Sequence, residues 1–91
     1  MGMYTIIFDY KGGTYVSQLY AKDEYLACLK WAQDLDTKEI EYIGERLKKK
    51  LLSDLSDEDN KPILLKGMLN VWFTMIALNG NAFIHIIKTY L

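Results

Sequence analysis

The chain of 91 residues has one cysteine, one proline, one histidine and almost no excess of either charge. The lone cysteine, Cys28, excludes an internal disulfide framework and fits a reducing compartment, so we expect a cytoplasmic protein. The net charge of −1 creates no basic field that would attract nucleic acid. The longest apolar run, 68–78, is too short for a membrane-spanning helix and contains Asn70 and Thr74, so we expect no membrane contact.

The length predicts one domain over residues 1–91, because a chain this short has room for a single core. Hydrophobic residues make up 51% and charged residues 25%, a balance typical of globular rather than disordered chains. Met3 can serve as the natural start, and we interpret Met1 and Gly2 as residues left by an expression vector.

Residues 3–10 and 14–21 are predicted strands, because both segments are rich in β-branched and aromatic side chains. Glycines between them permit a tight turn, which we place at Gly12-Gly13. The more apolar face of this pair is assigned to the core and carries Tyr4, Ile6, Phe8, Leu19 and Ala21. The other face carries Thr5, Asp9, Val16, Gln18 and Tyr20.

Residues 66–91 are predicted to form a long hairpin about Asn79-Gly80, since a two-residue type I′ turn needs positive φ at both positions. One parity of this hairpin is assigned to the core: Leu69, Val71, Phe73, Met75, Ile84 and Ile86. The opposite parity of the first strand is also apolar and includes Met68, Trp72, Ile76 and Leu78. A face in water should alternate to polar residues, so we expect this second face either to be covered or to bind something.

Two helices are predicted between the strand pairs. Asp23 can cap the first, which runs to about Leu35. Its apolar stripe is Tyr25, Cys28, Leu29, Ala32 and Leu35. Asp36 and Glu39 have the spacing of a capping box and predict that the second helix starts there. Its stripe is Ile40, Ile43, Leu47, Leu51 and Leu55, with Gly44 expected to permit a close approach to the sheet or to the other helix.

This order of elements predicts an α+β fold, a two-layer β-β-α-α-β-β domain. We expect a four-stranded antiparallel sheet with both helices on one face. A simple meander and an order that pairs the first strand with the last both satisfy the pattern.

No motif indicates catalysis, a metal or a cofactor, so we expect a protein that is not an enzyme. An enzyme would have to use His85 with Asp9, and no nucleophile obviously joins them. A structural zinc site needs four ligands, and Cys28 is expected on the opposite side of the sheet from His85. An RNA-binding sheet would combine Lys48-Lys49-Lys50 with open-face aromatics, but the lysines belong to the helix layer.

The strongest functional prediction is an interface on the uncovered sheet face. Its candidate residues are Tyr20, Trp72, Phe83, His85 and Ile87. Exposed apolar patches of this kind mark interfaces, with another protein or with a second copy in a homodimer. A second candidate surface is acidic and consists of Asp54, Asp57, Glu58 and Asp59. It would steer a basic partner, although a solvated turn is the more usual explanation of such a charge run.

The opening third of the chain, Tyr4-x-Ile6-x-Phe8-x-Tyr10-x-Gly12-Gly13-Thr14-Tyr15-x-Ser17-Gln18 followed by Ala27 and Trp31, resembles small uncharacterised bacterial proteins of the immunity-protein type. That resemblance implies a non-enzymatic protein that masks a toxin surface, and it transfers no binding residues. We therefore expect a protein-interaction domain, an immunity-like or antitoxin-like inhibitor. The alternative is a self-associating structural domain.

Overall fold

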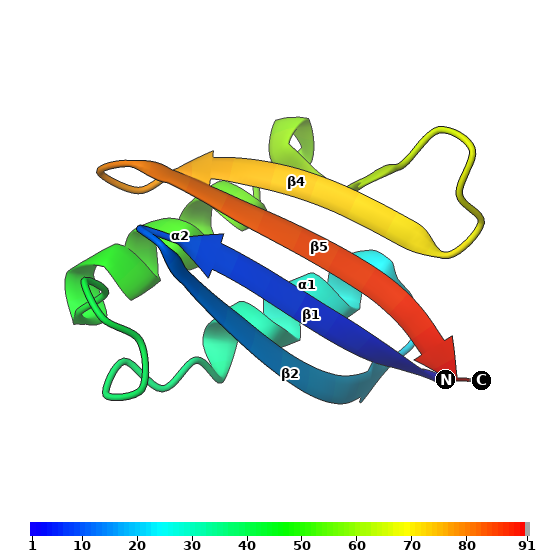
Figure 1. Ribbon diagram of the computed structural model, residues 1–91, viewed down its shortest axis with the longest axis horizontal. Helices are drawn as coiled ribbons and strands as arrows, with labels where there is room; N and C mark the ends of the chain where they lie inside the picture. Colours follow the sequence, from blue (N-terminus) through cyan, green and yellow to red (C-terminus); the bar gives the residue numbers. More distant parts are fainter. Residues whose placement is uncertain (91) are drawn as a thin grey trace.

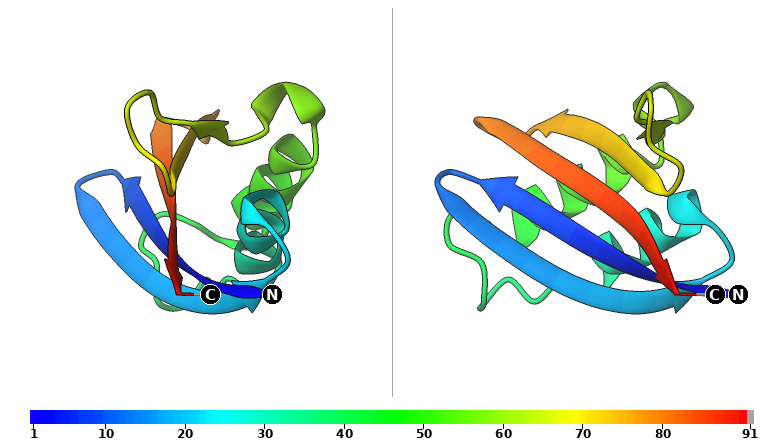
Figure 2. Two further views of the ribbon diagram at one scale, coloured as in Figure 1. Left: turned by 90° about the vertical axis from the view of Figure 1, so that its right-hand side faces the viewer. Right: turned by 45° about the vertical axis from the view of Figure 1, so that its right-hand side comes forward.

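The computed structural model describes residues 1–90 as one antiparallel sheet with two helices packed on one side (Figures 1 and 2). The strands are β1 (Gly2–Tyr10), β2 (Gly13–Ala21), β3 (Ile63–Leu64), β4 (Val71–Ala77) and β5 (Asn81–Tyr90). The helices are α1 (Glu24–Gln33), α2 (Glu45–Leu55) and the 3₁₀ turn η1 (Glu58–Asn60). The predicted α+β class is confirmed.

The sheet has five strands in the order β2-β1-β5-β4-β3, so the prediction of four was one too few. The additional strand, β3, is only two residues long and follows Pro62, which ends the preceding turn. Of the two strand orders left open, the chain adopts the one that pairs the first long strand with the last. This pairing places β1 and β5 at the centre of the sheet.

The β1–β2 hairpin turns at Lys11-Gly12, with φ of 46° and 82°, and Tyr10 pairs with Gly13. We expected the loop one residue later. That error displaces the register by two positions and therefore leaves every side chain on the predicted face. Tyr4, Ile6 and Phe8 are buried against the helices as predicted.

The β4–β5 hairpin differs from the prediction by one residue, and the consequence is large. Its loop has three residues, Leu78 to Gly80, because Ala77 pairs with Asn81. A shift of one position moves every side chain of a strand to the opposite face. The predicted core parity of β4 is therefore wrong, although Ile84 and Ile86 on β5 are buried as expected. Four residues predicted for the core lie outside it: Leu69, Val71, Phe73 and Met75.

Burial of Leu78 explains why the longer loop forms. Its side chain is fully buried, and its carbonyl oxygen accepts a hydrogen bond from the Tyr10 hydroxyl. Its N–H donates to the carbonyl of Gly80 over 2.7 Å. With Leu78 turned inward, Ile76, Thr74 and Trp72 follow on the helix side, as the two-residue period of a strand requires.

Helix α1 confirms its prediction: Asp23 is the N-cap, and its carboxylate accepts the N–H of Leu26 at 2.8 Å. The predicted start of α2 is wrong. Asp36 instead accepts the N–H of Lys38 in a turn, and the helix begins only after Gly44. Tyr42 has a φ of 69°, which interrupts any helix before that point.

Gly44 is the N-cap of α2 and does not serve a close approach. A Cβ added there would meet no atom within 4 Å. The irregular segment before it still contributes two of its predicted side chains, Ile40 and Ile43, to the core.

The core lies between the helices and the inner face of the sheet. Phe8 is fully buried at its centre, with its ring centroid 4.9 Å from that of Trp31. Cys28 is fully buried there as well, and burial raises the pKa of its thiol to about 12. The predicted interpretation of Cys28 as a small buried hydrophobe is consistent with this environment.

Candidate protein-interaction site

The face of the sheet opposite the helices is uncovered over the part of the chain that the structure describes (Figure 2). Strand pairing arranges its side chains in rows that cross the sheet. The central row contains one residue from each of the five strands: Val16, Ile7, His85, Phe73 and Ile63. Four of these five residues are apolar, and His85 lies at the middle of the row.

The β5, β4 and β3 half of this face is apolar. We call it the apolar half and define it by Ile63, Phe73, Met75, Phe83, His85 and Ile87. The exposed fraction of Ile63 is 72%, that of Met75 is 47% and that of Phe83 is 38%. These exposed apolar side chains are neighbours on one face rather than scattered over the surface, which makes this half of the sheet a candidate interface.

Phe73 lies at the centre of the apolar half. Its ring centroid is 4.9 Å from that of His85 and 6.2 Å from that of Phe83. Phe73 is half-buried although it faces away from the helices. This cluster is an ordered platform, because each ring is positioned by the strand pairing beneath it.

The β2 and β1 half of the same face is more polar. Gln18 donates to Thr5 over 3.0 Å, and Thr5 and Thr89 are joined by a hydroxyl–hydroxyl hydrogen bond. Thr14 donates to the carboxylate of Asp9 over 2.6 Å. The open face is thus divided into a polar half, whose side chains satisfy one another, and an apolar half.

Four of the five predicted interface residues lie on the open face: Tyr20, Phe83, His85 and Ile87. Trp72 does not, because the register of the β4–β5 hairpin turns it toward the core beside Tyr4, at 6.3 Å between ring centroids. Phe73 and Met75 take the place expected for Trp72, and Ile63 joins them from β3. The length of the β4–β5 loop alone decides whether Trp72 or Phe73 lies on the open face. No signal within β4 itself could therefore have identified Phe73 and Met75 as open-face residues.

His85 and Asp9 share the open face, since β1 pairs with β5, but they do not form a pair. Asp9 stands opposite Phe83, while His85 stands opposite Ile7. The Asp9 carboxylate is occupied by Thr14, and no hydrogen bond links it to His85 within residues 1–90. The arrangement therefore supplies no general base oriented by a carboxylate.

The acidic candidate surface has a structural explanation for two of its four members. Asp54 pairs with Lys50 one helical turn earlier, and Asp57 caps η1 by accepting the N–H of Asp59 at 3.0 Å. Glu58 and Asp59 are exposed. Both lie beyond the end of α2, in η1, whereas Asp54 lies in the last turn of α2.

Lys48, Lys49 and Lys50 lie on α2, in the layer behind the sheet (Figure 1). Lys50 also donates to the carbonyl oxygen of Ala77 over 3.0 Å. The basic run and the aromatic rings of the open face therefore lie on different sides of the molecule.

No family model, curated protein or solved structure matches this chain. Within residues 1–90, no group of three or more His, Cys, Asp or Glu side chains is placed to hold a metal ion. No helix of that same stretch is both long and apolar enough to cross a bilayer.

Proposed function

We propose that this chain is a non-catalytic protein-interaction domain that uses the open sheet face as its interface. The observation that carries the proposal is the apolar half, in which Ile63, Met75 and Phe83 are exposed around the Phe73 ring. Each large side chain of this kind gains about 1.5–3 kcal/mol when it moves from water into a fully buried site. Binding of a partner that covers this face would gain that free energy without any rearrangement of the sheet.

A second copy of the chain is the first occupant to test. Four long strands at about 4.8 Å spacing and about 25 Å length present roughly 500 Å² of flat area per copy. Two copies would bury about 1,000 Å², which reaches the lower limit of specific interfaces. The open-facing residues of β4 and β5 include no Asp, Glu, Lys or Arg, so these two strands of two copies can meet about a two-fold axis without like-charge repulsion, whereas the Asp9 carboxylate lies on the polar half.

Sedimentation of a matched set of variants tests this interface. Met75→Thr with Phe83→Thr removes apolar area and retains strand-favouring side chains, so we expect a folded protein that sediments as a monomer where the wild type is dimeric. Leu26→Gln is the control, because Leu26 is exposed on α1 in the other layer. A monomeric wild type at millimolar concentration would refute self-association through this face.

The resemblance of the opening third to immunity-type proteins favours a more specific function, that of an inhibitor which covers the working surface of a toxin. Glu58 and Asp59 would add electrostatic steering toward a basic toxin. Co-expression with the product of a neighbouring toxin gene tests this function. Protection of the host by the wild type, and loss of protection with Met75→Thr and Phe83→Thr, is the expected result. A neighbourhood of metabolic genes, with no toxin, counts against it.

A further inference from the structure

The outer edge of β2 lacks the features that usually prevent a strand from pairing. β2 is the first strand of the sheet and, within residues 1–90, pairs only with β1, in a continuous register. Its nine residues contain no proline and no charged side chain. Natural sheets block an edge of this length with lysine, proline or a bulge, because its free N–H and C=O groups otherwise recruit another strand. None of these features protects β2.

The hairpin geometry identifies which backbone groups are free. In a two-residue hairpin the residues that flank the loop exchange both hydrogen bonds, and the pattern then alternates along the strand. With Lys11-Gly12 as the loop, the N–H and C=O groups of Thr14, Val16, Gln18 and Tyr20 point away from β1. In the described part of the chain, no backbone hydrogen bond outside the sheet ladder uses residues 13–21.

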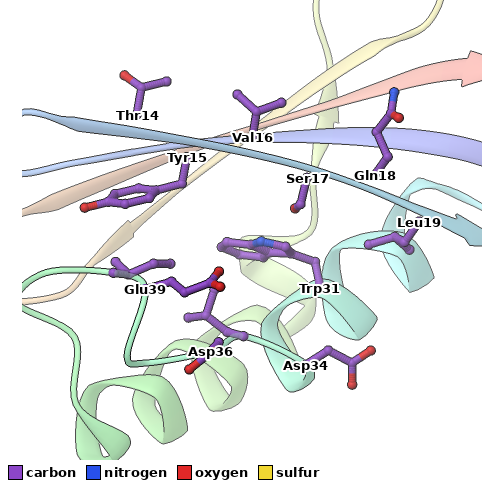
Figure 3. A pocket seen from close by; sticks show the side chains of 12 residues that line it. Thr14, Tyr15, Val16, Ser17, Gln18, Leu19, Trp31, Asp34, Asp36 and Glu39 are labelled. Carbon is purple, nitrogen blue, oxygen red and sulfur yellow. The ribbon is translucent and has the colours of Figure 1, made fainter.

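A cavity of about 500 Å³ runs along this edge on the helix side (Figure 3). Every residue of 14–19 lines it, so the cavity adjoins the backbone of the strand as well as one of its faces. Its opposite wall contains Trp31 of α1 with Leu35 and Ile40 of the following segment, all three of them buried. Figure 3 shows the indole of Trp31 beneath the strand, near Tyr15 and Ser17.

The rim of the cavity is acidic. Asp34, Asp36 and Glu39 line it and are exposed, whereas residues 33–40 include only one cation, Lys38. Among the residues described, the single ion pair is that of Lys50 with Asp54, so no lysine or arginine forms an ion pair with this rim. An aromatic wall beneath carboxylates that have no ion-pair partner suits a guanidinium or ammonium group, which can contact the ring and the negative charge together.

We propose that the free edge of β2 binds an extended basic segment of a partner protein by strand addition. In antiparallel pairing, side chains opposite Tyr15, Ser17 and Leu19 project to the helix side, into the acidic cavity. Arginine or lysine belongs at those alternate positions. The residues between them stand opposite Val16 and Gln18, and they supply the backbone hydrogen bonds to β2.

Charge selects this occupant over a second copy of the chain. Two β2 strands paired about a two-fold axis would bring Asp34, Asp36 and Glu39 of both copies to the same side of the joined sheet. Like charges placed that close oppose association, whereas a basic segment neutralises them. The site is also separate from the apolar half, which lies at the other end of the sheet.

The experiment uses a capped peptide that alternates arginine with valine, with binding followed by chemical shifts of the full chain and by calorimetry. We expect shifts concentrated in residues 14–20 and no binding of the same peptide with glutamate in place of arginine. Asp34→Asn with Glu39→Gln should weaken binding about tenfold, since it removes two exposed charge contacts. The matched control, Glu58→Gln with Asp59→Asn, removes the same two charges at a distant site and should leave binding unchanged.

Backbone methylation distinguishes strand addition from simple charge attraction. An N-methyl group on the valines removes the donors that face β2 and should abolish binding. The same group on the arginines points away from β2 and should be tolerated. Val16→Pro should keep the fold, because the Val16 N–H points outward, and should abolish binding. Equal effects of the two methylation patterns, or full binding to the Asp34→Asn and Glu39→Gln variant, would overturn the proposal.

Binding at the edge of β2 and association through the open face can be tested independently. Met75→Thr with Phe83→Thr should leave peptide binding intact even if it abolishes self-association. If Val16→Pro alters the sedimentation of the protein alone and no peptide binds, the edge pairs with a second copy and the assignment to a basic peptide is wrong.

Discussion

Phe73 and His85 stand directly opposite each other on β4 and β5, with their ring centroids 4.9 Å apart on the open face of the sheet. This relationship follows from the three-residue loop at Leu78 to Gly80. A two-residue loop would have placed Thr74 opposite His85 and turned Phe73 toward the helices.

Two adjacent residues of β4 test this register. Ile76 is 2% exposed and Met75 is 47% exposed. Ile76→Ala should lower the free energy of unfolding by about 2–5 kcal/mol, because it leaves a cavity in the core. Met75→Ala should lower it by less than about 1 kcal/mol, as is usual for surface substitutions. Denaturant unfolding of both variants measures the difference, and the reverse ranking would show that Met75 faces the core.

Phe73→Ala should have a moderate effect on stability. Phe73 is half-buried on the open face, beside the rings of Phe83 and His85, so we expect a loss of about 1–2 kcal/mol, compared with the 3–5 kcal/mol typical of a core phenylalanine. Phe8→Ala is the matched core substitution, since Phe8 is fully buried. Equal losses for the two variants in the same denaturant series would contradict this assignment.

The hydroxyl of Tyr10 should contribute measurably to the loop. It donates to the buried carbonyl of Leu78, and Tyr10→Phe leaves that carbonyl without this donor. We expect a loss of about 1–3 kcal/mol in unfolding free energy and faster amide exchange in residues 77–81. Tyr15→Phe is the control, because no hydrogen bond of the Tyr15 hydroxyl is formed within residues 1–90. Equal losses for both variants would indicate that loss of a tyrosine hydroxyl is costly in general and that the hydrogen bond to Leu78 contributes nothing specific.

Alkaline pH should destabilise the fold through Cys28. Burial raises the pKa of this thiol from its ordinary value of 9.0 to about 12, so between these values the unfolded chain releases a proton that the folded chain retains. The unfolded state therefore binds fewer protons, and stability falls as pH rises above 9, by up to about 1.4 kcal/mol per pH unit. Burial also raises the pKa of Tyr10, which adds to the loss in the same direction.

Unfolding measured from pH 7 to pH 11 in the wild type and in Cys28→Ala checks this effect. The variant should start lower, because it loses a buried side chain, and should decline less steeply with pH. In the folded wild type, thiol reagents should also fail to label Cys28 at pH 8. Identical slopes for the two proteins would mean that Cys28 does not govern the alkaline decline.

Gly44→Asp should stabilise α2 slightly. Gly44 is the N-cap, with an extended backbone and no side-chain cap, and an added Cβ meets no atom within 4 Å. An aspartate there can accept an N–H of the first turn and lies at the positive end of the helix dipole, so we expect a gain of a few tenths of a kcal/mol in unfolding free energy. A loss of more than about 1 kcal/mol would support a close packing role for this glycine.

Local signals in the sequence were sufficient for much of the fold. Asp23 ahead of an apolar stripe located the start of α1, because a cap and its helix lie within four residues of one another. The β1 and β2 faces were predicted correctly despite a misplaced turn, since an error of two positions preserves parity. The α+β class followed from the order of elements alone.

The apolar half of the open face was decided by tertiary structure. Both parities of β4 are apolar, so no alternation distinguishes Trp72 from Phe73 as the core residue. The choice depends on whether Leu78 belongs to the strand or to the loop, and burial of Leu78 beneath Tyr10 settles it. The same holds for the cavity beside β2, whose walls come from segments that only the packed fold brings together. The local sequence determines that side chains alternate between the two faces of a strand. Contacts between distant segments decide which of the two alternating sets faces the core.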